Sequence, residues 1–178
     1  MIKIFGRQPF FVFHHIIYEY KVSEKNNKQK LMVEKITDNI NEADMGYFSM
    51  RMLKKVLVKN KNKSEGYLFK NENGSSVIGF AIICYRGAKE MHYRIKNADA
   101  YISALGVFPA FQGKGYSQII LNLINSICFE KGFESLKLAV DNNNYIAIKS
   151  YEKFGFKRSE SKKFIRMLGI DLLIKKTI

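Results

Sequence analysis

Acidic residues are scarce in this sequence. Sixteen Asp and Glu residues accompany 30 Lys and Arg residues, which gives a formal net charge of +14 over 178 residues. Such a charge attracts polyanions, including nucleic acids, membrane surfaces and phosphorylated ligands. The lysines lie in short runs spread along the chain, and no basic-aromatic RNA-binding motif accompanies them. We therefore do not expect a nucleic-acid partner, whereas a phosphate-rich cofactor would benefit from the same charge.

Long hydrophobic runs and cysteines are also few. No apolar stretch approaches the roughly 18–20 residues that span a bilayer, and the apolar N-terminus lacks a small-residue cleavage site. We expect neither a membrane partner nor a signal peptide. Cys84 and Cys128 lie in separate apolar segments and have neither the number nor the spacing of metal ligands. We expect two buried free thiols in a cytoplasmic protein without a metal site.

The hydrophobic content, 47% of the residues, is enough for one domain with a small appendage. We expect residues 1–30 to form an aromatic N-terminal strand or arm and residues 31–178 to form the main domain. Apolar periodicity predicts the following elements. Strands are expected at 31–37, 77–85, 100–107 and 134–140, helices at 40–58, 113–131 and 143–154, and a final antiparallel pair at 156–158 and 163–168. This order predicts an α+β fold with a mixed sheet.

A glycine-containing turn joins the strand that ends at residue 107 to the next helix. From position 112 it has the sequence Gln-Gly-Lys-Gly-Tyr-Ser. Glycines let the backbone approach a ligand closely, and the free N–H groups and dipole of a helix N-terminus favour an anion. The spacing matches neither a Walker loop nor a dinucleotide fingerprint. The turn therefore predicts a diphosphate site, with a ligand-free structural turn as the alternative.

This turn resembles the Gln/Arg-x-x-Gly-x-Gly/Ala motif of the GNAT superfamily of N-acetyltransferases, with Ser117 where the family usually has Gly or Ala. A second segment, residues 144–156, resembles the family's Asn-x-x-Ala-x-x-x-Tyr-x-x-x-Gly-Phe pattern at every marked position. On a helix its Asn, Ala and Tyr lie on one face. The resemblance covers about residues 31–170, and its specific part is 105–156.

The resemblance implies a three-layer, GNAT-like fold. Helices flank a central, twisted and mostly antiparallel mixed sheet, in which two parallel strands, here 100–107 and 134–140, splay apart. Acetyl-CoA is the implied co-substrate and lies in that gap, with no metal. The residues implied to bind it are Leu105, Gly106, Val107, Gln112, Gly113, Lys114, Gly115, Tyr116, Ser117, Asn144 and Ala147.

The implied reaction is direct transfer of the acetyl group to a primary amine of a small molecule or peptide, by a monomer or a homodimer. Tyr151 is implied as the acid that protonates the departing thiolate. Two alternative functions remain open, a non-catalytic acyl-CoA sensor and a basic nucleic-acid-binding protein. The acceptor is not predicted.

The sequence does not identify the general base clearly. Family members often carry Glu or His at the positions held here by Tyr101 and Ser103, and neither is a convincing base. Strand alternation predicts that Asp99 shares a face with both. Asp99 acting through water is therefore our candidate base, with Ser103 as a second candidate. Glu90, His92 and water alone are alternatives.

Overall fold

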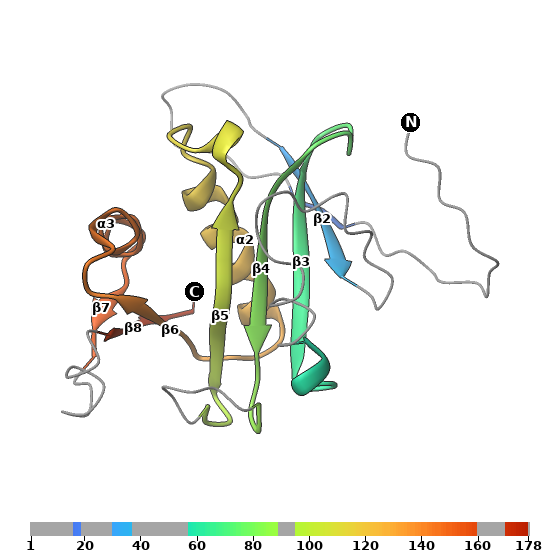
Figure 1. The fold of residues 1–178 in the computed structure, drawn as a ribbon. Coiled ribbons are helices and arrows are strands. Elements are labelled where there is room, and N and C mark those ends of the chain that lie inside the picture. Colours follow the sequence, from blue (N-terminus) through green and yellow to red (C-terminus); the bar gives the residue numbers. More distant parts are fainter. Residues whose placement is uncertain (1–15, 19–29, 37–56, 89–94, 160–169, 178) are drawn as a thin grey trace.

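The computed structural model describes residues 16–18, 30–36, 57–88, 95–159 and 170–177. Within these residues, eight strands form one sheet in the order β1-β2-β3-β4-β5-β6-β8-β7 (Figure 1). The strands are β1 (Ile16–Tyr18), β2 (Leu31–Ile36), β3 (Ser64–Asn71), β4 (Val77–Cys84), β5 (Asp99–Val107), β6 (Ser135–Asp141), β7 (Lys157–Arg158) and β8 (Ile170–Lys176). The helices that lie wholly within the described residues are the 3-10 turn η2 (Pro109–Phe111), α2 (Tyr116–Glu130) and α3 (Tyr145–Phe154), and residues 57–59 are also helical. No helix of this described part is long and apolar enough to cross a bilayer.

The sheet is mixed and mostly antiparallel, as predicted. Only β5 and β6 run parallel, and each of the other neighbouring pairs is antiparallel. A parallel pair needs a crossover connection, and α2 provides it between β5 and β6. The strand β1, from the N-terminal segment that we expected to form an extension, pairs with β2 at the edge of the sheet. These findings confirm the α+β fold class.

The helix α2 packs against one face of the sheet, and together they form the main hydrophobic core. Its apolar residues recur every three or four positions, so that one side of the helix is buried: Ile119, Ile120, Leu123, Ile124 and Ile127. They pack against sheet residues that include Phe69, Ile83, Ile102, Leu138 and Leu173. We predicted that this helix begins at residue 113, but it begins at Tyr116. Gly113 and Gly115 have φ angles of 72° and 83°, which are left-handed and incompatible with a helix.

A β-bulge in β5 changes which side chains face the α2 core. Ile82 pairs with Ala104 but Ile83 pairs with Ile102, so Ser103 is the extra residue. Before the bulge Ile102 packs in the α2 core, and after it Leu105 packs there. The simple alternation that we assumed for this strand is therefore interrupted at Ser103.

The parallel strands separate just beyond the bulge. The β5–β6 ladder runs from Asp99↔Ser135 to Ile102↔Leu138 and ends there, although both strands continue. Figure 1 shows β6 turning away from β5 towards α3. The predicted splayed gap is thus present, with its closed end at the start of both strands and its open end towards η2.

Two further boundaries differ from the predictions. The strand β7 does pair with a later strand, but Lys157 lies opposite Ile174, so the partner is β8 rather than residues 163–168. Those residues, like most of the helix expected at 40–58, lie outside the described part of the chain. The helix α3 starts two residues later than expected because Asn144 is its N-cap.

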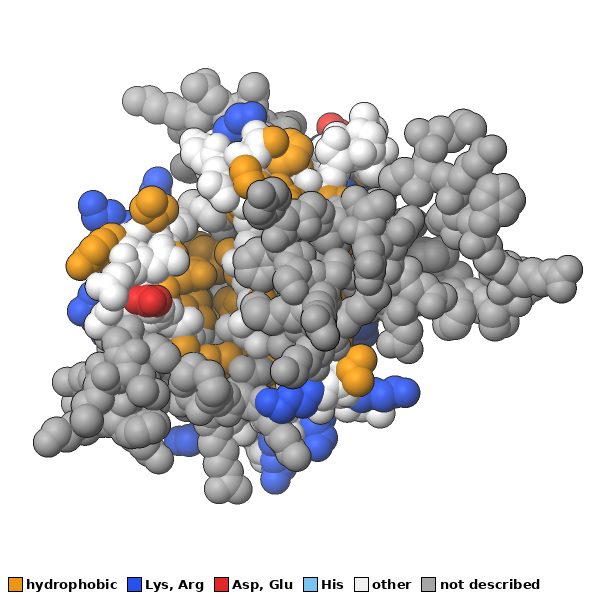
Figure 2. All heavy atoms as spheres, in the orientation of Figure 1, with side chains coloured by type: hydrophobic (Ala, Val, Ile, Leu, Met, Phe, Trp, Pro, Cys, Tyr) orange, Lys and Arg blue, Asp and Glu red, His pale blue; other side chains and the backbone are white. Residues whose placement is uncertain are grey.

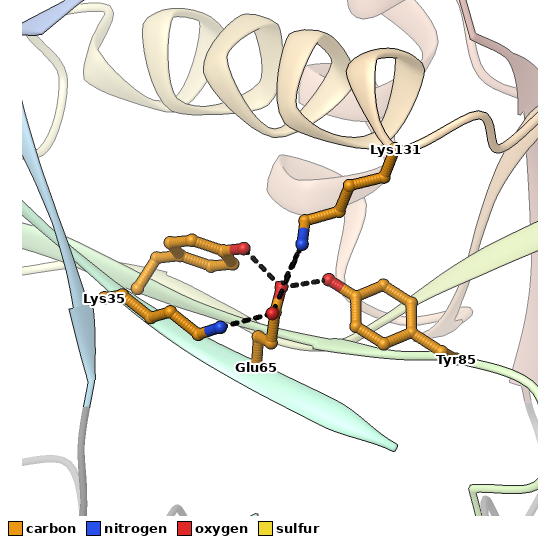
Figure 3. Close-up of polar contacts among 5 residues, drawn as sticks. Lys35, Glu65, Tyr85 and Lys131 are labelled. Atoms are coloured by element: carbon orange, nitrogen blue, oxygen red, sulfur yellow. Dashed lines mark hydrogen bonds and ion pairs between the residues drawn. The ribbon is translucent and has the colours of Figure 1, made fainter. Parts of the chain in front are cut away.

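A carboxylate that the sequence analysis did not identify ties α2 to the sheet (Figure 3). Glu65 on β3 accepts hydrogen bonds from the hydroxyls of Tyr67, at 2.6 Å, and Tyr85, at 2.5 Å. It also pairs with Lys35 on β2 and with Lys131 at the end of α2, whose Nζ lies 3.0 Å from Oε2. Burial alone would raise the pKa of Glu65, but these four contacts outweigh it and lower the pKa to about 2.

Candidate active site

In the open part of the gap, some backbone groups of β5 have no partner among the described residues. The Phe108 N–H donates to the Ile78 carbonyl on β4 at 2.9 Å. Because successive residues of a strand point their backbone groups to opposite sides, those of Leu105 and Val107 face away from β4 and into the gap. The Val107 carbonyl there accepts from the Gln112 amide at 2.9 Å. The groups left for a ligand are both backbone groups of Leu105 and the N–H of Val107, which can pair with an extended chain like an added strand.

Gly106 has no side chain, and this lets the Phe80 ring pack directly on the β5 backbone. A Cβ at this position would lie 2.5 Å from Cε1 of Phe80, whose ring therefore lies directly over the glycine on the face opposite α2. The Phe108 ring lies 6.1 Å from the Phe80 ring. Together they cover the face of β5 opposite α2 with apolar side chains.

The predicted diphosphate turn lies where β5 leads into α2. A Cβ at Gly113 or Gly115 would meet nothing within 4 Å, so the space beside the turn is open. Gly115 is the N-cap of α2 and gives no side-chain cap, which leaves the first N–H groups of the helix available to an anion. Lys114 is close by, although its Nζ donates to the Ala110 carbonyl at 2.9 Å. The Tyr116 ring packs edge-on against Phe111, so its backbone N–H is what it offers a ligand.

Ser117, the departure from the family motif, takes part in a contact between the two helices. Ser150 on α3 donates to the Ser117 hydroxyl at 3.1 Å, and Gln118 Nε2 donates to Ser150 at its carbonyl (2.9 Å) and hydroxyl (3.1 Å). We call these three residues the α2–α3 bridge. Ser117 accepts in this bridge, so its own proton remains able to reach a phosphate. Gln118 and Ser150 could not be predicted from the sequence, because they meet only when the two helices pack.

The other motif residues lie on or at the start of α3, the helix that follows β6. Asn144 Oδ1 accepts from the Ala147 N–H at 3.1 Å, so its Nδ2 is the group left for a ligand. Ala147 and Tyr151, one turn apart, both pack against the α2 core. Figure 2 shows hydrophobic side chains at the bottom of a hollow between α3 and β5.

Tyr151 is poised as a neutral donor. Its ring packs edge-on against Phe156, with centroids 5.8 Å apart. Burial raises the pKa of its hydroxyl, because a phenolate is poorly solvated there. No acceptor for that hydroxyl is present among the described residues. The group therefore stays protonated near neutral pH and can donate to a ligand.

The structure argues against Asp99 as the base. Asp99 begins β5 at the closed end of the gap, about 20 Å along the strand from Leu105. Its buried carboxylate accepts from Lys137 Nζ at 2.8 Å and from the Ser135 hydroxyl at 2.7 Å. A buried ion pair of this kind is typical of a structural role. Ser103, in contrast, lies at the bulge where the strands separate.

Other predicted candidates lie elsewhere. Glu90 and His92 fall outside the described residues. Tyr101 is buried on the face opposite α2, where it packs with Phe80 and Ile82. The described residues contain no group of three His, Cys, Asp or Glu side chains that can hold a metal ion.

Known proteins share this architecture. Among curated proteins, the uncharacterized N-acetyltransferase YdgE of Bacillus subtilis (strain 168) is 36% identical over 58 residues, which are 33% of this chain and 37% of that protein. A Bacillus subtilis acetyltransferase in complex with CoA superposes with a TM-score of 0.66 at 14% identity, covering 84% of this chain and 100% of that one. A GNAT family acetyltransferase from Elizabethkingia anophelis with acetyl-CoA bound gives 0.61 at 18% identity, covering 82% and 97%.

The match to the curated relative spans little more than a third of its length, and the structural likenesses have low sequence identity, so they show the fold alone. A family model covers more of the chain. The model of the acetyltransferase (GNAT) family matches residues 32–156, well over half of the sequence, including β5, the diphosphate turn and α3. This protein therefore belongs to the acetyltransferase (GNAT) family.

Proposed function

We propose that this protein is an acetyl-CoA-dependent N-acetyltransferase that transfers the acetyl group directly to a primary amine of a small molecule or peptide. The main support is that three unlike groups belong to elements that pack on the same core, to which Leu105, Tyr116 and Tyr151 all contribute. These are the free backbone of β5, the N-terminus of α2 and the neutral Tyr151 hydroxyl. We also propose that it works in the cytoplasm as a monomer or homodimer.

The proposed binding mode assigns a role to each predicted residue. Leu105 and Val107 pair through their backbones with the pantetheine arm. Residues 112–117 hold the diphosphate through backbone N–H groups, helped by the Lys114 charge and the Ser117 hydroxyl. Asn144 contributes its Nδ2, and Ala147 leaves room for the arm to pass. The net charge of +14 favours the approach of this anionic co-substrate.

The reaction needs stabilisation of the negative charge on the carbonyl oxygen and proton transfers at the leaving sulfur and at the amine. The neutral amine attacks the thioester carbonyl carbon, and the Leu105 N–H hydrogen-bonds the oxygen as it becomes negative, which contributes about 3 kcal/mol in comparable sites. The C–S bond then breaks, and Tyr151 donates its proton to the leaving thiolate. The amine loses one proton to water near Ser103, and the tyrosinate is reprotonated from solvent. Acetylated amine and free CoA thiol are the products.

Tyr151→Phe tests this function. Release of free CoA thiol from acetyl-CoA, measured with a panel of primary amines, is expected to fall roughly 100-fold, since general acid catalysis contributes at least that much. The affinity for acetyl-CoA, measured by calorimetry, should change less than about twofold. Tyr145→Phe, on the same helix but exposed, is the matched control and should leave both unchanged. Full turnover by Tyr151→Phe would contradict the assigned acid.

The same measurements separate the alternatives. A sensor would bind acetyl-CoA without releasing thiol for any amine in the panel. A nucleic-acid-binding protein would bind RNA in a salt-sensitive way that saturation with CoA does not reduce.

A further inference from the structure

A second concave site lies on the protein, apart from the gap. It is a cavity of about 1080 Å³ bounded by α2, the C-terminal end of α3, β7 and the last residues of β8. We call it the α2–β8 groove. None of the residues proposed to bind acetyl-CoA lines it. Its volume is at the upper end of the range for sites that take a small organic ligand.

The lining of the α2–β8 groove is strongly cationic. Five of its side chains carry positive charge, and the described residues that line it include no carboxylate: Lys153, Lys157, Arg158, Lys175 and Lys176. Glu152, outside the lining, approaches Arg158 at 3.8 Å, but both side chains are largely exposed and such a pair is weak. Like charges gathered in a concavity repel one another and concentrate a positive potential there. An anion in the groove would relieve that repulsion.

Lys175 is the cation with the clearest need of a counter-charge. Its Nζ lies 5.1 Å from the Phe154 ring centroid and donates to the Lys176 carbonyl at 3.2 Å. Burial lowers its pKa, because the ammonium is partly removed from water. No carboxylate of the described residues pairs with it. The fold thus holds a partly desolvated ammonium against an aromatic ring at the wall of a cavity.

The opposite wall offers amide oxygens. Gln118 and Asn122 line it one helical turn apart on α2. Each donates an amide N–H within the protein, Gln118 to Ser150 and Asn122 to the Gln118 carbonyl at 2.9 Å. The amide oxygens are the groups left to accept from a ligand's hydroxyl or amino groups. Phe154 and Ile174 add apolar surface to the lining of the groove.

A ligand that fits all three features carries phosphate at one end, a flat apolar body, and hydroxyl or amino donors. We propose that the α2–β8 groove binds a nucleotide, with its phosphates on Lys157, Arg158 and Lys175 and its sugar or base on the Gln118 and Asn122 side. This site is separate from the acetyl-CoA gap and does not depend on the proposed transfer reaction.

The test titrates the full-length protein with ADP while CoA is present at saturation, using calorimetry. Binding is expected to persist, because CoA occupies the gap and not the groove. Lys157→Gln and Lys175→Gln should each weaken ADP binding about tenfold and leave the CoA affinity unchanged, which also shows that the variants fold. Lys149→Gln, an exposed lysine of α3 that does not line the groove, is the matched control and should change nothing.

Four outcomes would overturn the proposal. The first is the absence of ADP binding. The second is its loss when CoA saturates the protein, which would assign the ADP to the gap. The third is equal weakening by Lys149→Gln, which would mean attraction by the overall charge. The fourth is equally tight binding of inorganic pyrophosphate, which would mean that the groove recognises phosphate alone and not a nucleotide.

Discussion

Removing the charge of Glu65 should destabilise the fold by about 2 kcal/mol at neutral pH. Its pKa of about 2 lies well below the ordinary value near 4.3, and such a difference corresponds to about 3 kcal/mol. The side chain is 15% exposed, so solvent screening reduces this to about 2 kcal/mol. Because the folded pKa is the lower one, the stabilisation is complete above about pH 5. It is lost as the pH falls from there through about 2.

Urea unfolding of Glu65→Gln, followed by circular dichroism, measures this effect. The midpoint should fall by about 1 M at pH 7, for a denaturant dependence near 2 kcal/mol per molar urea. At pH 3 the difference from the wild type should shrink to about 1 kcal/mol, because the Glu65 carboxyl of the unfolded chain is then mostly protonated while that of the folded protein, with a pKa of about 2, is still largely ionised. Glu72→Gln is the control, because Glu72 is 70% exposed and lies 4.0 Å from Lys30. Equal stability of the two variants at pH 7, or a difference that does not narrow with acid, would refute the reasoning.

Three further predictions concern Gly106, Ser150 and the two cysteines. Gly106→Ala places a methyl group against the Phe80 ring and should cost about 2 kcal/mol, seen as a melting temperature lower by about 5 °C; an unchanged melting temperature would show that the ring moves freely. Ser150→Ala breaks the α2–α3 bridge and should raise the KM for acetyl-CoA severalfold with little change in kcat, and an effect on kcat alone would contradict this. Both cysteines are buried, and burial raises the pKa of Cys128 to about 12, so neither should react with a thiol reagent at pH 8 before urea is added.

The parts of the site that are local in sequence were predictable. The turn at 112–117 and the α3 pattern depend on glycine conformation and helical spacing, which a single segment specifies. Contacts between distant segments were not predictable. Asp99 looked available as a base until Lys137, 38 residues away, proved to be its partner. The partners of Glu65 come from two strands, from the residue after β4 and from the end of α2, and no spacing in the sequence predicts that arrangement.

The bulge in β5 shows a second limit. Side chains of a strand alternate between the two faces of the sheet unless a bulge adds an extra residue to the strand. In β5 this extra residue is Ser103. The sequence around it, Tyr-Ile-Ser-Ala-Leu, carries no glycine or proline to mark the irregularity. The position of the bulge depends on the register between β5 and β4, and that register cannot be read from the sequence of β5 alone.

The early end of the β5–β6 ladder has a consequence for handling the protein. Beyond Ile102 and Leu138 the sheet carries two internal strand edges, and strand edges are the places where sheets of separate molecules join. In the proposed complex the pantetheine arm covers one of them. Protein purified without CoA should therefore associate more readily on concentration than protein kept with it, and light scattering can follow this. Supply of the co-substrate then governs solubility as well as turnover.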